Sequence, residues 1–211
     1  MNEPAPELRP FALALALAVA LAAPRAEANP DAWRRSYALE SRGDPRGALA
    51  ALEGVGAQGA RGYLYELRRA WLLYQSGRYD DAVTAYEQAA TSSRGAIEPR
   101  VGELLPLLAL RRWRDAERVA RDVLRVDAGN YLASRRLALA LYNLGRFDAA
   151  RTAYQGVLAR YPGDLEMLSG VGWCELRLGR RDQAAAAFRA VLAVSPDDAT
   201  ATAGLSAAAA R

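Results

Sequence analysis

Small side chains recur along this chain with a period of 34 residues, and the period predicts paired helices. Each period contains a short polar junction, and the junction residues follow one another without a gap: Gly43, Gly77, Arg111, Gly145 and Gly179. Five residues beyond each junction stands an alanine: Ala48, Ala82, Ala116, Ala150 and Ala184. We expect two antiparallel helices around each junction, because glycine adopts the left-handed conformation that ends a helix and alanine lets two backbones approach.

Two further positions fit the same frame. Four residues beyond the alanine comes a mostly large residue, which we expect to fill the gap to the next repeat: Leu52, Tyr86, Ala120, Tyr154 and Phe188. Pro162 and Pro196 close two of the periods and stop the second helix of each pair. The predicted repeats are 29–62, 63–96, 97–130, 131–164 and 165–198, followed by a C-terminal capping helix over 199–211.

This pattern resembles the tetratricopeptide repeat family, and the resemblance covers residues 29–211. It implies an all-α fold, an α-solenoid wound as a right-handed superhelix, in which stacked repeats build one continuous core. The repeat 97–130 departs from the pattern, because Arg111 replaces the junction glycine and Pro106 lies inside the first helix, where we expect a kink. The first repeat has a glycine-rich second helix, which we expect to fray.

The N-terminus has the pattern of an export signal. Residues 11–23, FALALALAVALAA, are an uninterrupted apolar run that is too short to span a bilayer as a stable helix. The sequence Ala26-Glu27-Ala28 that follows matches a cleavage site, so residues 1–28 are predicted to be a signal peptide cleaved after Ala28. We therefore expect an exported, periplasmic protein of bacterial type.

The segment before the apolar run leaves an alternative open. Signal peptides begin with a positively charged region, whereas Glu3 and Glu7 here offset Arg9. An uncleaved anchor or a misassigned start codon remains the other interpretation. No cysteine lies near the predicted cleavage site to carry a lipid, so we expect contact with a membrane only through a partner.

The composition argues against catalysis, metal binding and nucleic-acid binding. The chain has no histidine and a single cysteine, Cys174, which we interpret as a small apolar core residue. No phosphate-binding loop, nucleophile elbow or dinucleotide fingerprint occurs, and we expect no cofactor and no enzyme activity. The adjacent acids Asp80-Asp81 and Asp197-Asp198 fit helix starts. The net charge is +4, and the arginines alternate with acids instead of forming a basic stripe.

The family resemblance implies that the first helix of each repeat lines a concave groove. Twelve residues at these positions form our predicted partner-binding groove: Trp33, Tyr37, Leu67, Trp71, Tyr74, Leu105, Arg135, Leu139, Tyr142, Asn143, Trp173 and Arg177. Exposed aromatic residues beside arginine and asparagine are typical of a binding hot spot. The alternative is that some of these rings pack between neighbouring helices.

The groove indicates a protein–protein interaction scaffold, or adaptor, in the bacterial cell envelope. It suits an apolar or aromatic peptide with an acidic group near Arg135 and Arg177. A polysaccharide ligand stays open, because aromatic rings also stack on sugars. The alternative function is a periplasmic subunit of an exopolysaccharide-secretion or outer-membrane assembly machine. A clamp for a C-terminal tail is disfavoured, because Trp33 and Trp71 occupy places where that subset of the family has polar residues.

Overall fold

The computed structural model describes residues 30–53, 55 and 60–210, and in this part the chain is entirely helical. The predicted signal segment 1–28 lies outside the described residues. Eleven helices follow one another: α1 (Pro30–Glu40), α2 (Pro45–Ala50), α3 (Ala60–Gln75), α4 (Tyr79–Ser92), α5 (Glu98–Ala109), α6 (Trp113–Val126), α7 (Tyr131–Asn143), α8 (Phe147–Leu158), α9 (Leu165–Arg177), α10 (Arg181–Val194) and α11 (Ala199–Ala209).

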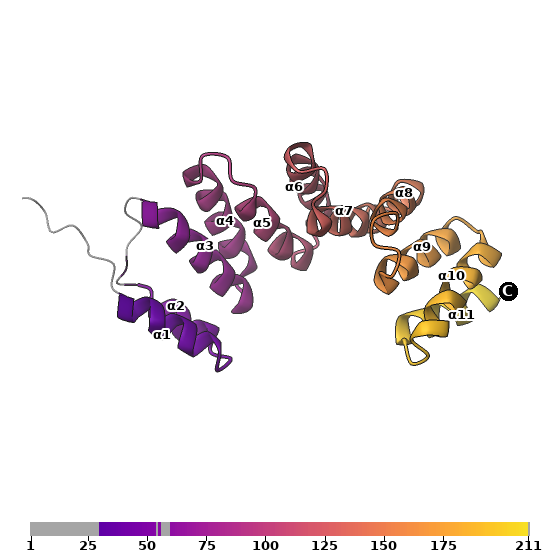
Figure 1. The fold of residues 1–211 in the computed structure, drawn as a ribbon, viewed down its shortest axis with the longest axis horizontal. Helices are drawn as coiled ribbons and strands as arrows, with labels where there is room; N and C mark the ends of the chain where they lie inside the picture. Colours follow the sequence, from indigo (N-terminus) through magenta and orange to yellow (C-terminus); the bar gives the residue numbers. More distant parts are fainter. Residues whose placement is uncertain (1–29, 54, 56–59, 211) are drawn as a thin grey trace, which may run out of the picture.

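The helices pack in consecutive antiparallel pairs and build an arch (Figure 1). Each helix contacts the next one along the chain, and α11 packs against both α9 and α10. In the view of Figure 1, α1 and α11 lie at the two lower ends of the arch, whereas α6 and α8 lie on its outer, upper side. The predicted all-α solenoid is confirmed.

The five repeated alanines lie where the two helices of each pair meet. Ala48, Ala82, Ala116, Ala150 and Ala184 are all fully buried. Four junction glycines have φ between 76° and 78°, and Arg111 adopts the same left-handed conformation at φ 56°. The turn geometry is therefore kept even where the glycine is lost, at the cost of strain that a side chain brings to this region.

In three of the repeats the large aromatic residue of the second helix packs on the following repeat, as expected. The rings of Tyr86 and Phe188 lie against Gly102 and Gly204, sixteen residues further on, and an added Cβ at either glycine would come closer than 3.0 Å to the ring. Tyr154 packs on Gly170 in the same way. Glycine at this place in the first helix therefore makes room for an aromatic ring.

The position of these glycines in the repeat holds arginine where the residue sixteen positions earlier is not aromatic. Leu52 is followed sixteen residues later by Arg68, and Ala120 is followed by Arg136. Both arginines stand in the first helix of a pair, α3 or α7. Across the chain the two positions therefore hold one of two combinations: an aromatic residue followed by glycine in three cases, and a smaller residue followed by arginine in two.

The two atypical repeats differ from the others in their helices. Pro106 is buried inside α5, and the helix continues past it to Ala109. In the first repeat α2 ends after six residues, at Ala50, whereas the second helices of the other four pairs have twelve or fourteen. The expected fraying concerns Gly54, Gly56, Gly59 and Gly62, of which the first three lie outside the described residues.

Candidate binding groove

Three adjoining hollows run along the first helices of the pairs and form one groove. The first lies between α1 and α3, the second between α3, α5 and α7, and the third between α5, α7 and α9. Leu67 and Trp71 line both the first and the second hollow, while Leu105, Leu132 and Arg136 line both the second and the third. The cavity volumes are about 610, 250 and 210 Å³ in this order.

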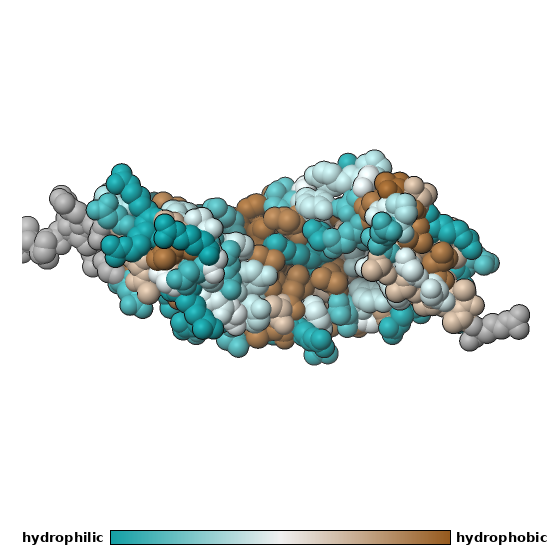
Figure 2. Space-filling view, turned by 90° about the horizontal axis from the view of Figure 1, so that it is seen from below, coloured by the Kyte–Doolittle hydropathy of each residue, from teal (hydrophilic) through white to brown (hydrophobic). Residues whose placement is uncertain are grey.

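The groove exposes apolar side chains to solvent. Tyr37, Leu64, Leu132 and Leu139 are 56%, 53%, 40% and 39% exposed, and all four line the first or the third hollow. Seen from below the arch, apolar residues gather in the middle of the molecule (Figure 2). A contiguous exposed apolar surface in a concavity is the kind of surface that binds a partner.

Arg68, at the floor of the first hollow, has its charge neutralised by its own chain. It is 8% exposed, and its Nη1 donates to the carboxylate of Glu40. Its Nε and Nη2 atoms donate to the Ser36 hydroxyl at 3.3 and 3.1 Å. The guanidinium also lies 3.9 Å from the centre of the Tyr37 ring, a cation–π distance. Three residues of α1 therefore hold this arginine.

Glu40 completes the cluster by binding a second donor. The indole Nε1 of Trp71 donates to Glu40 Oε1 at 2.5 Å, so the tryptophan is fixed at the edge of the groove. Burial raises the pKa of Glu40, but the hydrogen bonds from Trp71 and Arg68 outweigh burial and lower it below its ordinary value. Glu40 is therefore an ionised counterion for Arg68 at neutral pH.

Arg136 stands at the same repeat position two repeats later and has no such counterion. Its Nη1 donates to the carbonyl oxygen of Val101 at 2.6 Å, and it forms no ion pair with any described carboxylate. The residues that correspond to Ser36 and Glu40 are Leu104 and Leu108, which carry no acceptor. Burial lowers the pKa of Arg136, since its positive charge is partly removed from water among apolar side chains.

Arg135, which we predicted to receive an acidic group, is already paired. Its Nε donates to Glu166 Oε1 at 3.1 Å, and its Nη2 forms an ion pair with the other carboxylate oxygen. Hydrogen bonding to Glu166 raises the pKa of Arg135. Of the two arginines that line the third hollow, Arg136 is therefore the one without a carboxylate partner among the described residues.

Glu98 places one negative charge beside the first and second hollows. Its Oε2 accepts a hydrogen bond of 2.5 Å from the Tyr63 hydroxyl, and the side chain is exposed. Burial, together with the nearby Glu98 carboxylate, raises the pKa of Tyr63 to about 12. The groove consequently runs from an acidic group near α3 to an unpaired arginine on α7.

Seven of the twelve predicted groove residues line the three hollows, and five do not. Those that do are Trp33, Tyr37, Leu67, Trp71, Leu105, Arg135 and Leu139. The other five are Tyr74, Tyr142, Asn143, Trp173 and Arg177. Sequence reasoning left Arg68, Glu98 and Arg136 out of the predicted set. The sequence did contain a signal for Arg68 and Arg136. Both stand at a repeat position that is glycine in three other repeats, and in both cases the residue sixteen positions earlier is not aromatic.

The remaining predicted aromatic residues pack against other rings. The Trp173 ring meets Phe188 edge-on at 5.4 Å, and the Tyr142 ring meets Phe147 at 5.4 Å. Tyr74 lies 5.8 Å from Trp71, which is itself a groove residue. The alternative interpretation, packing between helices, therefore describes Trp173 and Tyr142.

The two polar members outside the hollows have contacts of their own. The Arg177 guanidinium lies 4.6 Å from the centre of the Phe147 ring. The amide of Asn143 donates to the backbone carbonyl of Leu139 at 2.9 Å, one turn earlier in α7. Both side chains are exposed near the end of a first helix, beyond the hollows.

The residues that carry potential chemistry have structural surroundings. Cys174 is fully buried, and burial raises the pKa of its thiol to about 12, so the thiol is unreactive at neutral pH. Asp198 caps α11 by accepting from Ala201 N at 2.7 Å. Among the described residues, no three His, Cys, Asp or Glu side chains gather as metal ligands. None of the described helices combines the length and apolarity of a membrane span.

Solved structures similar to this chain share its fold at low sequence identity. A tetratricopeptide repeat protein from Parabacteroides merdae aligns with a TM-score of 0.78 and 15% identity, over 85% of this chain and 71% of that protein. MamA from Desulfovibrio magneticus, from its residue 41 to its end, gives 0.74 and 18%, over 81% and 96%. YrrB, described as a protein of the same repeat type with an unusual peptide-binding site, gives 0.71 and 16%, over 85% and 92%.

The sequence itself matches a family model. No curated protein matches the chain. The model of the tetratricopeptide repeat matches residues 34–97, 106–164 and 172–211, which is more than half of the sequence. Proteins built from this repeat act as scaffolds that bind peptide or protein partners. Together with the helix pairs, the buried alanines and the left-handed junctions, this match shows that the chain belongs to the tetratricopeptide repeat family.

Proposed function

We propose that the chain is a scaffold whose groove binds an apolar segment of a protein partner, and that Arg136 receives a carboxylate from that segment. The observation that carries the proposal is the half-buried guanidinium of Arg136, which has no carboxylate partner among the described residues and lies beside the exposed Leu132 and Leu139. Because burial disfavours the charged arginine, an incoming carboxylate relieves that cost and gains charge-assisted hydrogen bonds.

The first repeat gives an internal template for this contact. There, Glu40 of α1 reaches Arg68 of α3 and neutralises it. The distance in sequence between Leu108 and Arg136 is the same, yet Leu108 offers only methyl groups. Leu108 and Arg136 line one hollow, so a carboxylate lying over Leu108 would be placed as Glu40 is placed over Arg68. The partner thus supplies what the chain provides for itself at Arg68.

The apolar surface of the groove indicates that the remaining side chains of the ligand are apolar. Leu132 and Leu139 are exposed beside Arg136, and burying a large aliphatic side chain contributes about 1.5–3 kcal/mol. A hydrogen bond to a charged group contributes about 1.5–3 kcal/mol. A leucine-rich or aromatic peptide with one acidic residue therefore matches the groove in both respects. The unusual peptide-binding site of the structurally similar YrrB adds support for a peptide ligand.

A capture experiment with matched variants tests the groove. We expect Leu132→Asp combined with Leu139→Asp to abolish co-purification of a partner from bacterial envelope extract, as read by mass spectrometry. The control combines Val126→Asp with Val194→Asp, since these residues are 73% and 71% exposed outside the groove. Equal capture by both double variants would refute the groove as the binding surface.

The proposed place of action is the bacterial cell envelope, specifically the periplasm. The apolar run 11–23 and the motif Ala26-Glu27-Ala28 support export with cleavage after Ala28. Expression of the full chain in bacteria, followed by fractionation and N-terminal sequencing, tests it. A mature N-terminus at Asn29 in the periplasmic fraction is expected, and an intact chain in the cytoplasm would refute export.

A further inference from the structure

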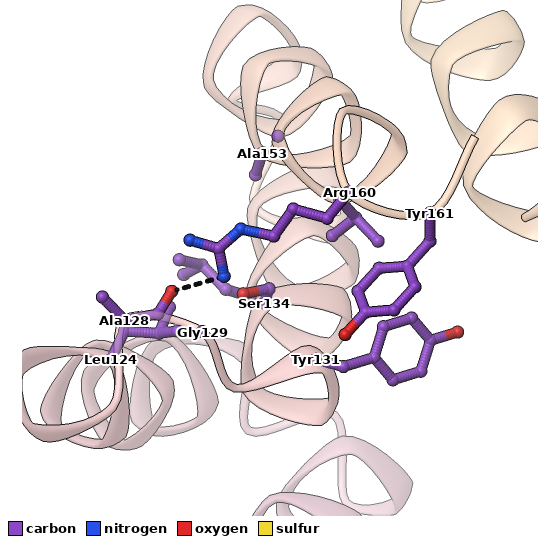
Figure 3. Close-up of a pocket in the computed structure, with 11 residues that line it drawn as sticks. Leu124, Ala128, Gly129, Tyr131, Ser134, Ala153, Arg160 and Tyr161 are labelled. Carbon is purple, nitrogen blue, oxygen red and sulfur yellow. Dashed lines mark hydrogen bonds between the residues drawn. The ribbon is translucent and has the colours of Figure 1, made fainter.

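A further hollow, shown in Figure 3, lies between α6, α7 and α8. Figure 1 places α6 and α8 on the outer side of the arch. We call this hollow the outer pocket. Its volume is about 250 Å³, and its floor is apolar, with Leu124, Leu137 and Val157 among its lining residues. It shares no lining residue with the three hollows of the groove. The outer pocket and the groove are therefore lined by different side chains.

Two small residues, Gly156 and Ser134, line the outer pocket, and Gly156 is exposed on α8. Gly156 lies inside α8, and a Cβ added there would have no atom within 4 Å. By contrast, added Cβ atoms at Gly102 and Gly204 would collide with rings, so packing explains those glycines. A glycine inside a helix destabilises the protein by comparison with alanine. The space beside Gly156 is therefore kept open although filling it would favour folding.

The corresponding residues one repeat later are larger. Ser134 and Gly156 correspond to Leu168 and Ala190. Leu168 packs against the apolar core of the last repeats. The hydroxyl of Ser134 faces the outer pocket and has no hydrogen bond to any described residue. At these places the next repeat has one packed side chain, Leu168, and an exposed alanine, Ala190.

An arginine and two aromatic rings border the opening. Figure 3 shows the Arg160 side chain extending across the pocket, with Nη1 donating to the carbonyl oxygen of Ala128 at 3.2 Å. Arg160 forms no ion pair with a described carboxylate, so its other donors are available. Tyr131 and Tyr161 meet edge to face at 4.9 Å beside it, and Tyr161 is 45% exposed. The pocket thus combines an apolar interior with a cationic and aromatic rim.

The surface next to the outer pocket is basic. A shallow hollow on α6 shares Leu124 and Leu137 with it. Its charged lining residues are Arg114, Arg118, Arg121, Arg125, Glu117 and Asp122, so cations outnumber anions by four to two. The pairs of Asp122 with Arg118 and Arg125 are largely solvent-exposed, and such pairs contribute little to stability, whereas Glu117, which pairs with Arg121 and Arg146, is 16% exposed. Acidic groups of a partner can replace the pairs of Asp122 at small cost.

We propose that the outer pocket is a second binding site, which takes one bulky apolar side chain from an acidic segment of a partner protein. The apolar side chain fills the space left by Gly156 and Ser134. Carboxylates on either side of it contact Arg160 and the arginines of α6. The scaffold can then hold two protein segments at once, one in the groove and one on its outer surface.

The experiment measures the binding of fluorescent peptides to the purified chain by anisotropy. The probe is a short amidated peptide of Glu and Ala with one central Phe, compared with a peptide in which Ser replaces Phe and one in which Gln replaces every Glu. Burial of the ring predicts an affinity about tenfold or more higher than that of the Ser peptide. The Gln peptide should also bind more weakly than the Glu peptide with Phe, because it cannot pair with the arginines.

Variants assign the binding to the outer pocket. Gly156→Leu fills the pocket and should weaken binding of the Phe peptide about tenfold or more, while thermal unfolding shows a stability equal to or above that of the parent. The matched control Ala190→Leu, at the same repeat position, should leave binding unchanged. Arg160→Gln should reduce the difference between the Glu and Gln peptides. Arg136→Gln, which alters the groove, should have no effect on these peptides.

The proposal is overturned by any of four results. These are equal binding of the Phe and Ser peptides, binding that Gly156→Leu leaves intact, no binding at about millimolar peptide, or weakening by Arg136→Gln in place of Gly156→Leu. The last result would assign the peptide to the groove and leave the proposed function standing. A concentration-dependent dimer that Gly156→Leu abolishes would make a second copy of the chain the occupant, and would also overturn the proposal.

Discussion

Arg68 and Arg136 occupy the same repeat position but have opposite surroundings. Arg68 is almost fully buried, and Glu40, Ser36 and Tyr37 hold its charge. Arg136 is half-buried and has one backbone carbonyl as its partner. One position of the repeat therefore serves two purposes. Near the N-terminal end of the described chain it locks two repeats together, and two repeats later it offers a charge inside an apolar groove.

The difference arises in the helix before each arginine. Helix α1 carries polar residues on the side that faces Arg68, whereas α5 carries Leu104 and Leu108 at the corresponding places. Both leucines favour burial and neither accepts a hydrogen bond. Fold and binding are thus specified by different positions. The alanines and junctions determine how the helices stack, and the residues that face Arg68 or Arg136 determine whether that arginine has a carboxylate partner.

The largest expected effect comes from removing the internal counterion. Glu40→Leu gives the first repeat the residue found at Leu108 and should destabilise the protein by about 3 kcal/mol, since it leaves a buried arginine without its carboxylate. Urea unfolding followed by circular dichroism measures it. Glu87→Leu, at an exposed glutamate without an ion pair, is the control and should change the free energy of unfolding little. Equal effects of the two substitutions would mean that Arg68 does not need Glu40.

A smaller effect should follow from exchanging the two pairings of the repeat. Ala120→Tyr introduces a ring sixteen residues before Arg136, at the position that Tyr86 holds before Gly102. Overpacking against Arg136 should lower the free energy of unfolding by about 2 kcal/mol. Adding Arg136→Gly recreates the pairing of Tyr86 with Gly102 and should recover most of that loss. A double-mutant cycle of urea unfolding measures the coupling. Additive effects would show that Ala120 and Arg136 do not share a space.

The smallest effect concerns the buried carboxylate that α5 does carry. Glu103 does not serve Arg136, because its Oε2 accepts from Arg100 at 2.9 Å and its Oε1 has no partner among the described residues. Burial raises the pKa of Glu103 above its ordinary 4.5, although Arg100 opposes this. With a raised folded-state pKa, its stabilising contribution is complete below pH 4.5 and is lost as the pH rises through the folded value.

The variant Glu103→Gln isolates this dependence. It should gain stability relative to the parent as the pH rises from below 4.5 towards neutrality, as measured by urea unfolding at several pH values. Arg100→Gln is the companion variant, because it removes the positive charge that opposes the raised pKa of Glu103. In this variant the stability that is lost as the pH rises should be larger than in the parent chain. A stability difference between Glu103→Gln and the parent that does not change with pH would contradict the raised pKa.

The fold could be predicted from the sequence because its determinants repeat. Five alanines and five junctions at one spacing each report the same contact, so a weak repeat, such as the one with Arg111, does not obscure the pattern. The packing of an aromatic residue of the second helix on the next repeat could be predicted for the same reason, because its position also recurs with the period. The period alone does not predict the short α2, which ends at Ala50.

The groove could be predicted in part. Leu67, Trp71 and Leu105, which were chosen from family positions, line the hollows, whereas their role in binding stays a prediction. They could not tell that Trp173 packs on Phe188, because this depends on the space left by neighbouring glycines such as Gly172. The pairing of Arg135 with Glu166 likewise joins residues from two repeats, and which of two adjacent arginines remains unpaired depends on side-chain contacts rather than on spacing.

The most direct test supplies Arg136 with its own carboxylate. Leu108→Glu reproduces the relation of Glu40 to Arg68, and Leu108→Gln is the uncharged control. Anisotropy measures the affinity of a leucine-rich amidated peptide with one central Glu, of the same peptide with Gln, and of the Gln peptide with a free C-terminal carboxylate. These peptides separate a side-chain carboxylate from a terminal one.

We expect the parent chain and Leu108→Gln to prefer one of the carboxylate peptides over the amidated Gln peptide by about tenfold or more. Leu108→Glu should lose that preference, because its own carboxylate then occupies the guanidinium of Arg136. Equal affinity of the parent for all three peptides, or a preference that survives in Leu108→Glu, would contradict the role of Arg136.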